Sequence, residues 1–315
     1  MAFPYEEFDL SDVRTYPLAS RKSKVNAADF ATPHEKGAGL DAFVAHLPNI
    51  LGASDFRAVV KAIVAARASG GGIIWGFGAH VIKTGLSPIL IDLARRGFVS
   101  AFATNGAGII HDFEIALCGS TSEDVDEALG PGRFGMSEET GKLLNAAINS
   151  GVADGLGIGQ AVGKYLADAK PKFGHLSVVQ SAARMGIPIT AHVALGTDII
   201  HMHPDASGKA IGEGSLRDFR YFVSNVARLN RGVYLNCGSA VLLPEVFLKA
   251  VALARNRGIA LEGLTTVNLD FARLYRPQIN VVSRPPAGTG GRGYSLVGQH
   301  EILIPLLAAA LIEAS

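Results

Sequence analysis

The feature that most constrains this chain is the alternation of short apolar runs with longer amphipathic segments, with glycine at the junctions. Apolar runs cover residues 72–78 and 98–104, and the segments beside them have apolar residues at helical spacing. Glycine accounts for 37 of the 315 residues and gathers at these corners. The pattern predicts an α/β fold with a doubly wound, largely parallel sheet covered by helices on both faces, a Rossmann-like arrangement.

The same rhythm continues to the end of the chain. Strands are expected at residues 72–78, 98–104, 187–195, 232–236, 261–268 and 278–283. Helices are expected at 55–68, 86–96, 137–150, 159–169, 175–185, 216–229, 244–257 and 300–314, with another ending at Cys118. Residues 1–38 lack a clear period and are expected to form an N-terminal arm over the domain or a neighbouring subunit, with a partly ordered tail as the alternative. A single α/β domain is expected at 39–315.

Composition narrows the classes of function. Hydrophobic residues make up 48% of the chain, so a disordered protein is excluded. Lysine and arginine number 29 against 28 acidic residues, which argues against nucleic-acid binding. The longest apolar run, 302–312, is too short for a bilayer, and the acidic N-terminus is not a signal peptide. We therefore expect a cytoplasmic protein with a small-molecule substrate and no membrane or nucleic-acid partner.

Ligands of open parallel sheets bind where the strands end, so the loops after the expected strands are candidate sites. The first loop is rich in glycine and carries His80, Lys83 and Thr84. It matches neither phosphate-binding fingerprint, because Val81 and Ile82 stand where glycine is required. We expect His80 and Thr84 to bind a cofactor and Lys83 to act in catalysis; the alternative is a tight turn.

The second loop leads directly into a helix. Its residues are Asn105, Gly106, Ala107 and Gly108, followed by His111 and Asp112. A helix start lowers the proton affinity of a nearby histidine, which suits a general acid/base. We predict that the four small residues bind the cofactor, that His111 is catalytic and that Asp112 contacts substrate. The alternative is a capping Asp112 beside a packed His111.

The third loop contains Asp198, His201 and His203. We predict that Asp198 is catalytic, as the substrate-orienting partner of His111, and that the two histidines contact substrate. Neighbouring histidines also occur as metal ligands, but no HExxH-type spacing accompanies them, so no metal is expected.

Two further segments follow later strands. Cys237 and Gly238 end an apolar run and are expected at the cofactor, although a buried, inert thiol is the alternative for Cys237. Arg292 lies in a glycine-rich stretch at 284–293, where its guanidinium is expected to hold a substrate anion.

At these loops the chain resembles the deoxyhypusine synthase family, whose members bind NAD in an α/β fold of this size. The resemblance lies in five segments with matching order and spacing, residues 80–87, 98–112, 196–203, 235–238 and 302–307. It implies that Asn105, Gly106, Ala107 and Gly238 lie along NAD and that Asp198 faces the substrate. It also implies a homotetramer with sites at subunit interfaces.

The chain departs from this family in its chemistry. The family forms an imine on a lysine late in the chain, but the last lysine here is Lys249, and Arg292 stands in the corresponding stretch. A guanidinium does not form such an imine near neutral pH. Ile110 and His111 replace a Glu-Glu pair, and Leu242 lies where a histidine is expected. We therefore expect that this chain is not a functional deoxyhypusine synthase.

Three hypotheses remain open from the sequence. The first is an NAD(P)-dependent oxidoreductase or transferase acting on a small substrate, amines included. The second is a catalytically silent binding protein on the same fold. The third is a metal-assisted hydrolase or lyase that uses His111, Asp112, Asp198, His201 and His203.

Overall fold

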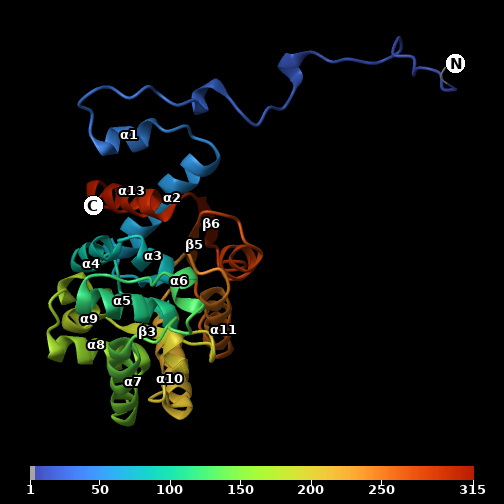
Figure 1. Cartoon of the computed structure of the whole chain (residues 1–315). Coiled ribbons are helices and arrows are strands. Elements are labelled where there is room, and N and C mark those ends of the chain that lie inside the picture. Colours follow the sequence, from blue (N-terminus) through green and yellow to red (C-terminus); the bar gives the residue numbers. More distant parts are fainter. Residues whose placement is uncertain (1–3) are drawn as a thin grey trace.

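A six-stranded sheet forms the centre of the computed structural model, which describes residues 4–315 (Figure 1). The strands are β1 Ile73–Phe77, β2 Ala101–Asn105, β3 Ile189–His192, β4 Val233–Cys237, β5 Thr265–Asp270 and β6 Arg292–Val297. Their order is β3-β2-β1-β4-β5-β6, and every pairing is parallel. The expected Rossmann-like, doubly wound α/β fold is confirmed.

Helices fill the connections between the strands. The first half contains α1 Leu40–His46, α2 Leu51–Ala68, α3 Ala79–Lys83, α4 Ser87–Arg95, α5 Gly106–Cys118, α6 Val125–Leu129 and α7 Glu138–Ala153. The second half contains α8 Ile158–Ala169, α9 Val178–Met185, α10 Gly208–Val226, α11 Leu242–Asn256, α12 Tyr275–Pro277 and α13 His300–Glu313. The sequence placed most of the longer helices correctly, although α10 begins eight residues before the expected 216.

The central strands are fully buried because both faces of the sheet are covered by helices. Alternate side chains of β1 enter opposite cores. Trp75 packs with residues of α2, α4, α5 and α13, whereas Ile74 packs with residues of α10 and α11. Trp75 pairs with Phe102 of β2 and Leu235 of β4, so β1 lies in the middle of the sheet.

The last strand is not where the sequence predicted it. Residues Gln278–Ser283 were expected as a strand but form one turn of π-helix, and Val281 of this turn is buried in the α10–α11 core. The sixth strand is instead Arg292–Val297, which begins at the end of the glycine-rich stretch 284–293 and lies where no strand was expected. Its partly exposed edge position and the glycines before it hide the apolar signal of a strand. The apolar β-branched residues within 279–282 gave that segment the composition of a strand, so a strand was expected there.

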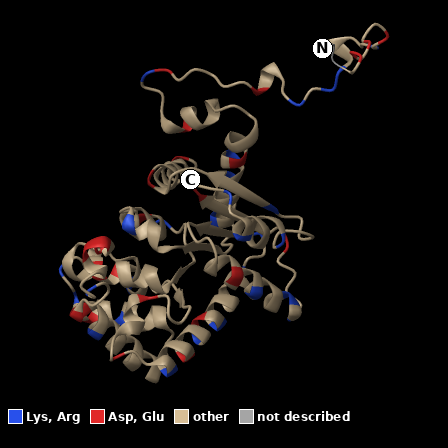
Figure 2. Cartoon of the chain, turned by 45° about the vertical axis from the view of Figure 1, so that its right-hand side comes forward, with Lys and Arg blue, Asp and Glu red and all other residues tan. Residues whose placement is uncertain are grey.

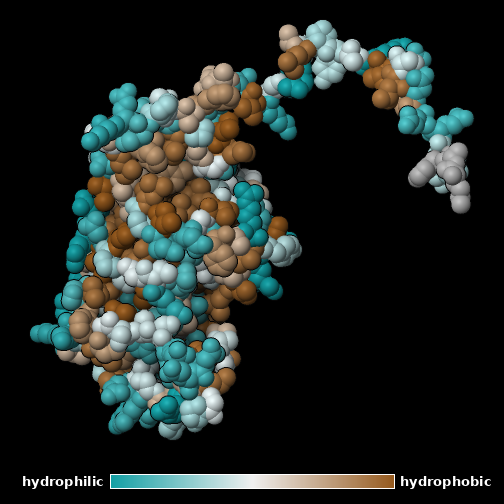
Figure 3. Space-filling view, turned by 45° about the horizontal axis from the view of Figure 1, so that its top comes forward, coloured by the Kyte–Doolittle hydropathy of each residue, from teal (hydrophilic) through white to brown (hydrophobic). Residues whose placement is uncertain are grey.

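Residues 4–39 extend away from the α/β body as an arm with two short 3-10 turns (Figure 1). Large apolar side chains of the arm are exposed, including Phe8 and Tyr16. Hydrophobic surface also gathers on the body near the end from which the arm departs, where Ile302 of α13 is exposed (Figure 3).

Charged residues of both signs are interspersed over the body (Figure 2), in line with a formal net charge of +1. Among residues 4–315, no helix combines the length and apolar character needed to cross a bilayer.

Candidate functional site

The sheet changes winding direction between β1 and β4, and the loops after these strands meet at its carboxyl edge. The Gly78 amide donates to the Cys237 carbonyl at 2.9 Å. A Cβ on Gly78 would lie 2.5 Å from the Gly238 oxygen, so only glycine permits this approach of the two backbones. Gly238 itself has a φ of 67°, a left-handed conformation that favours glycine. This topological switch point is where open α/β sheets bind ligands.

Helix α5 begins at the same edge, directly after β2. The Asn105 side chain caps it by accepting from the Gly108 amide at 2.8 Å. The Asp198 carboxylate lies against Gly106, where a Cβ would come within 1.8 Å of Oδ2. The fold therefore places a carboxylate at the positive end of the α5 dipole, across 92 residues of sequence.

A cavity of about 400 Å³ opens beside this helix start. It contains the three predicted catalytic residues, Lys83 of α3, His111 of α5 and Asp198. The rest of its lining is Ala107, Ile110, Glu114, Ser122, Glu123, Val125, Phe134, Gly135, Ser137, Thr197 and Ile199. The structure thus brings together residues from three loops that are far apart in the sequence.

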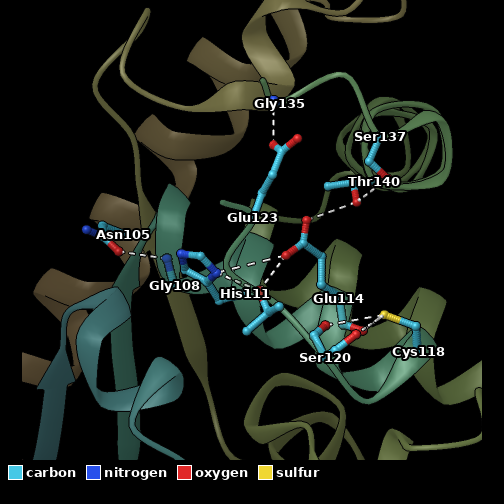
Figure 4. Close-up of polar contacts among 11 residues, drawn as sticks. Asn105, Gly108, His111, Glu114, Cys118, Ser120, Glu123, Gly135, Ser137 and Thr140 are labelled. Carbon is cyan, nitrogen blue, oxygen red and sulfur yellow. Dashed lines mark hydrogen bonds and ion pairs between the residues drawn. The ribbon is translucent and has the colours of Figure 1, made fainter. Parts of the chain in front are cut away.

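His111 lies between the start of α5 and Glu114 (Figure 4). Its Nδ1 is 2.7 Å from the Thr121 hydroxyl and 3.9 Å from Glu114 Oε2. Burial lowers the pKa of His111 below its usual value, an effect opposed by Glu114 and reinforced by Lys83. The histidine is therefore mainly neutral near pH 7, as a general base must be.

Asp198 and His201 form a second polar pair at the cavity. The Asp198 Oδ2 and His201 Nε2 atoms are 3.9 Å apart, and the two side chains are 6% and 9% exposed. Both atoms are buried without a hydrogen-bond partner among residues 4–315. Burial raises the pKa of Asp198, while His201 and a hydrogen bond from Thr197 oppose the rise. Asp198 lines the cavity, whereas His201 lies outside the cavity lining, so the structure does not bring His201 to the other candidate residues there.

Two carboxylates of the cavity were not among the residues singled out from the sequence. Glu114 lies three residues after His111 on α5, so both side chains reach the same side of the helix. Glu123 lies in the segment between α5 and α6, and its Oε2 accepts from the Gly135 amide at 2.8 Å (Figure 4). Helical spacing could have indicated Glu114, whereas no sequence signal indicated Glu123.

Asp112 has a structural role in place of the predicted contact with substrate. Its side chain is 1% exposed, and its oxygens accept from the Ser177 hydroxyl and from the Val178 amide at 2.7 Å. Burial raises the pKa of Asp112 to about 6 despite these hydrogen bonds. It points away from the cavity because adjacent residues on a helix face different directions. Asp112 therefore anchors the start of α9 to α5.

His203 also lies outside the cavity lining. Its Nε2 bonds to the Gly135 carbonyl at 2.8 Å, and its ring occupies the space where a Cβ of Gly141 would lie. The five residues of the metal-assisted hypothesis therefore do not converge. Among residues 4–315, no group of three or more His, Cys, Asp or Glu side chains is arranged to hold a metal.

The remaining predicted contacts lie outside the cavity lining. The Cys237 side chain is fully buried in the core, so only its backbone reaches the carboxyl edge. Thr84 bonds to the His80 carbonyl at 2.9 Å, while the His80 ring lies 5.5 Å from that of His300. Arg292 begins β6 at the opposite, amino edge of the sheet, 3.8 Å from Asp55. The structure does not bring Arg292 to the other candidate residues.

Comparison with known proteins gives structural neighbours but no sequence family. No family model matches the chain, and no curated protein matches it. ArgZ, a cyanobacterial arginine dihydrolase, is 17% identical with a TM-score of 0.51, over 85% of this chain and 34% of ArgZ. AgrE, crystallised with ornithine and NAD+, is 17% identical with a TM-score of 0.54, over 82% of this chain and 33% of AgrE.

A protein assigned as a deoxyhypusine synthase from Entamoeba histolytica matches over nearly its whole length. It is 13% identical with a TM-score of 0.51, over 90% of this chain and 96% of that protein. This chain spans about one third of ArgZ and AgrE. At such sequence identities the likeness shows the fold alone. Enzymes share this fold, and one of them, AgrE, was crystallised with NAD+. The resemblance to deoxyhypusine synthases thus holds at the level of the fold.

Proposed function

We propose that this protein is an NAD(P)-dependent oxidoreductase or transferase that acts on a small amine in the cavity beside α5. One observation carries the proposal: Lys83, His111 and Asp198, chosen as catalytic from separate loops, line a single cavity at the carboxyl edge of a parallel sheet. AgrE, a neighbour in fold, binds ornithine, an amine, together with NAD+.

The charges of the cavity support an amine. Glu114, Glu123 and Asp198 supply three carboxyl groups against one ammonium, that of Lys83. Opposite unit charges 4 Å apart attract by about 4 kcal/mol at the effective dielectric constant of a protein surface. A protonated amine therefore gains from this cavity, and a simple anion is repelled by it.

The proposed nucleotide position is at the carboxyl edge of the sheet, where the loops after β1 and β4 meet (the β1–β4 corner). His300 Nε2 donates to the Leu269 carbonyl at 3.0 Å, so His300 Nδ1 is an acceptor, and it is buried without a partner among residues 4–315. The His300 ring lies directly against Gly238 and is 1% exposed, so it supports the Gly238 peptide from within the fold. The peptide groups of Gly78 and Gly238, with His80, are the proposed nucleotide contacts.

The start of α5 is poorly suited to phosphate. The Asp198 carboxylate already lies against Gly106, so a phosphate there would meet a like charge. Asp198 lines the cavity, so its carboxyl group is placed to accept from a ribose hydroxyl or from the substrate ammonium. We therefore assign residues 105–108 to the sugar or substrate end of the bound ligands.

NAD supplies the hydride acceptor when it is bound. The protein must then orient the amine and remove a proton from its nitrogen as the neighbouring carbon is oxidised. His111 is the base in this proposal, and Asp198 orients the amine. In the transferase form of the reaction, the neutral Lys83 amine adds to the imine carbon of the oxidised substrate and displaces the original nitrogen as ammonia or an amine, which leaves an imine on Lys83; a guanidinium cannot do this.

Binding of NAD+ and NADH to the full-length protein by calorimetry is the first test, and absence of binding would overturn the cofactor assignment. Amines are then screened for reduction of NAD+ by absorbance. We expect His111→Gln to lower the turnover number at least 100-fold while NAD+ affinity changes less than threefold. Lys164→Ala, on the exposed face of α8, is the control and should alter neither quantity.

A further inference from the structure

A chain of polar side chains lies behind His111, on the side away from the start of α5 (Figure 4). The Thr121 hydroxyl is within hydrogen-bond distance of both His111 Nδ1, at 2.7 Å, and Glu114 Oε2. Oε1 of Glu114 accepts from the Thr140 hydroxyl of α7 at 3.1 Å. Glu114 is thus held from two sides, and Thr121 lies between it and the imidazole.

Donor and acceptor counting fixes the direction of these hydrogen bonds. A carboxylate only accepts, so the single hydroxyl hydrogen of Thr121 is donated to Glu114. The Thr121 oxygen can then only accept from His111, and the imidazole proton must be on Nδ1. Glu114 does not replace Thr121 as the direct acceptor, because 3.9 Å is too long for a hydrogen bond.

From this geometry we propose that Thr121 and Glu114 are positioning residues that hold His111 as the Nδ1–H tautomer and leave its Nε2 as the base. Nε2 makes no hydrogen bond within residues 4–315, and the ring borders the cavity. In Figure 4 the second ring nitrogen points away from Glu114. When Nε2 accepts a proton, Glu114 stabilises the imidazolium and Thr121 keeps the ring from rotating.

The role of His111 as a base rests on the proposed function, but the tautomer does not. It can be measured in the free, full-length protein by NMR of the ring nitrogens of 15N-labelled histidine at pH 8. His111→Gln identifies the signals of His111 by their loss. We expect a protonated Nδ1 and an unprotonated Nε2 in the wild-type protein, and a protonated Nε2 would overturn the proposal.

Three variants separate positioning from general packing. Thr121→Val removes the hydroxyl at similar volume and should shift the His111 proton largely to Nε2, whereas Thr121→Ser should retain the wild-type tautomer. Thr140→Val removes the other hydrogen bond to Glu114 and should leave the tautomer of His111 unchanged. An unchanged tautomer in Thr121→Val would contradict the inferred role of Thr121.

Kinetics separates failure of this inference from failure of the proposed function. With an amine substrate, Thr121→Val should lower kcat at least tenfold and change KM less than twofold, and Thr121→Ser should restore kcat. If no cofactor binds, the proposed function fails while the tautomer measurement still decides the arrangement of His111. If kcat is unaffected while the tautomer changes, His111 Nε2 is not the base.

Discussion

Asp218 provides a test of how this fold handles a buried carboxyl group. It lies on α10 and is fully buried between α8 and the sheet. Its Oδ2 accepts from the Gly159 amide at 2.9 Å and from the Ala191 amide at 2.8 Å. Burial raises the pKa of Asp218 to about 7, although these hydrogen bonds and Arg217 act in the opposite direction.

The raised pKa gives the free energy of unfolding a defined pH dependence. Between the ordinary value of 3.8 and about 7, the native state binds a proton at Asp218 that the unfolded state lacks. The stabilisation that this proton gives the native state is therefore fully present below pH 3.8, and it is lost as the pH rises through 7. At 1.36 kcal/mol for each pKa unit, the wild-type protein loses about 3 kcal/mol from this group between pH 5 and pH 8.

The variant Asp218→Asn cannot lose this proton. Its amide oxygen can accept the same two hydrogen bonds, and its unpartnered NH2 group adds a pH-independent cost of about 1–3 kcal/mol. Relative to the wild-type protein, its free energy of unfolding should therefore rise by about 3 kcal/mol from pH 5 to pH 8. Taking the difference cancels groups with the opposite dependence, such as His192, whose pKa burial lowers to about 3.

Urea unfolding followed by the fluorescence of Trp75, a fully buried side chain and the single tryptophan of the chain, measures this difference. Asp168→Asn is the control, because the Asp168 side chain is 72% exposed. The difference in free energy of unfolding between Asp168→Asn and the wild-type protein should vary by less than about 0.5 kcal/mol from pH 5 to pH 8. A flat difference for Asp218→Asn would refute the assignment of a raised pKa to Asp218.

Two further predictions concern the candidate site and the cysteines. Lys83→Ala should raise the pKa of His111, because the ammonium of Lys83 disfavours the imidazolium. The pKa of His111 is measured by NMR titration, and Lys164→Ala, the control, should leave that pKa unchanged. A lowered pKa of His111 in Lys83→Ala would contradict the cavity geometry. The exposed Cys118 should react with a disulfide reagent in the native protein, whereas Cys237 should react only in denaturant, because burial raises the pKa of its thiol. Two fast-reacting thiols in the native protein would disprove this placement of Cys237.

The fold was readable from the sequence wherever a strand is buried on both faces. The run at 72–78 contains β1 because every residue of Ile73–Phe77 is buried, so the apolar signal is continuous. The edge strand Arg292–Val297 gives no such signal, because most of its residues are only partly buried. Its position depends on pairing with Thr265–Asp270, a contact that no local pattern encodes.

The site was predictable only where topology constrains it. Lys83, His111 and Asp198 could be chosen because parallel strands bring their carboxyl-end loops to one edge. Asp112 was expected at the substrate because it adjoins His111, but it lies outside the cavity lining and bonds to Ser177, which is 65 residues away in the sequence. Glu123 enters the cavity through an irregular segment, where the backbone path depends on tertiary contacts and not on periodicity.

The connection between α5 and α7, residues 119–137, contains only the short helix α6 and bears on how proteins of this architecture can diverge. Glu123, Val125, Phe134 and Gly135 of this connection form part of the cavity lining. The strand order and the meeting of the β1 and β4 loops do not depend on it. Insertions or exchanges in such a connection alter the shape and charge met by an incoming molecule without repacking the sheet. Grafting segments of other composition here should therefore change the cavity wall while the sheet keeps its strand order and packing.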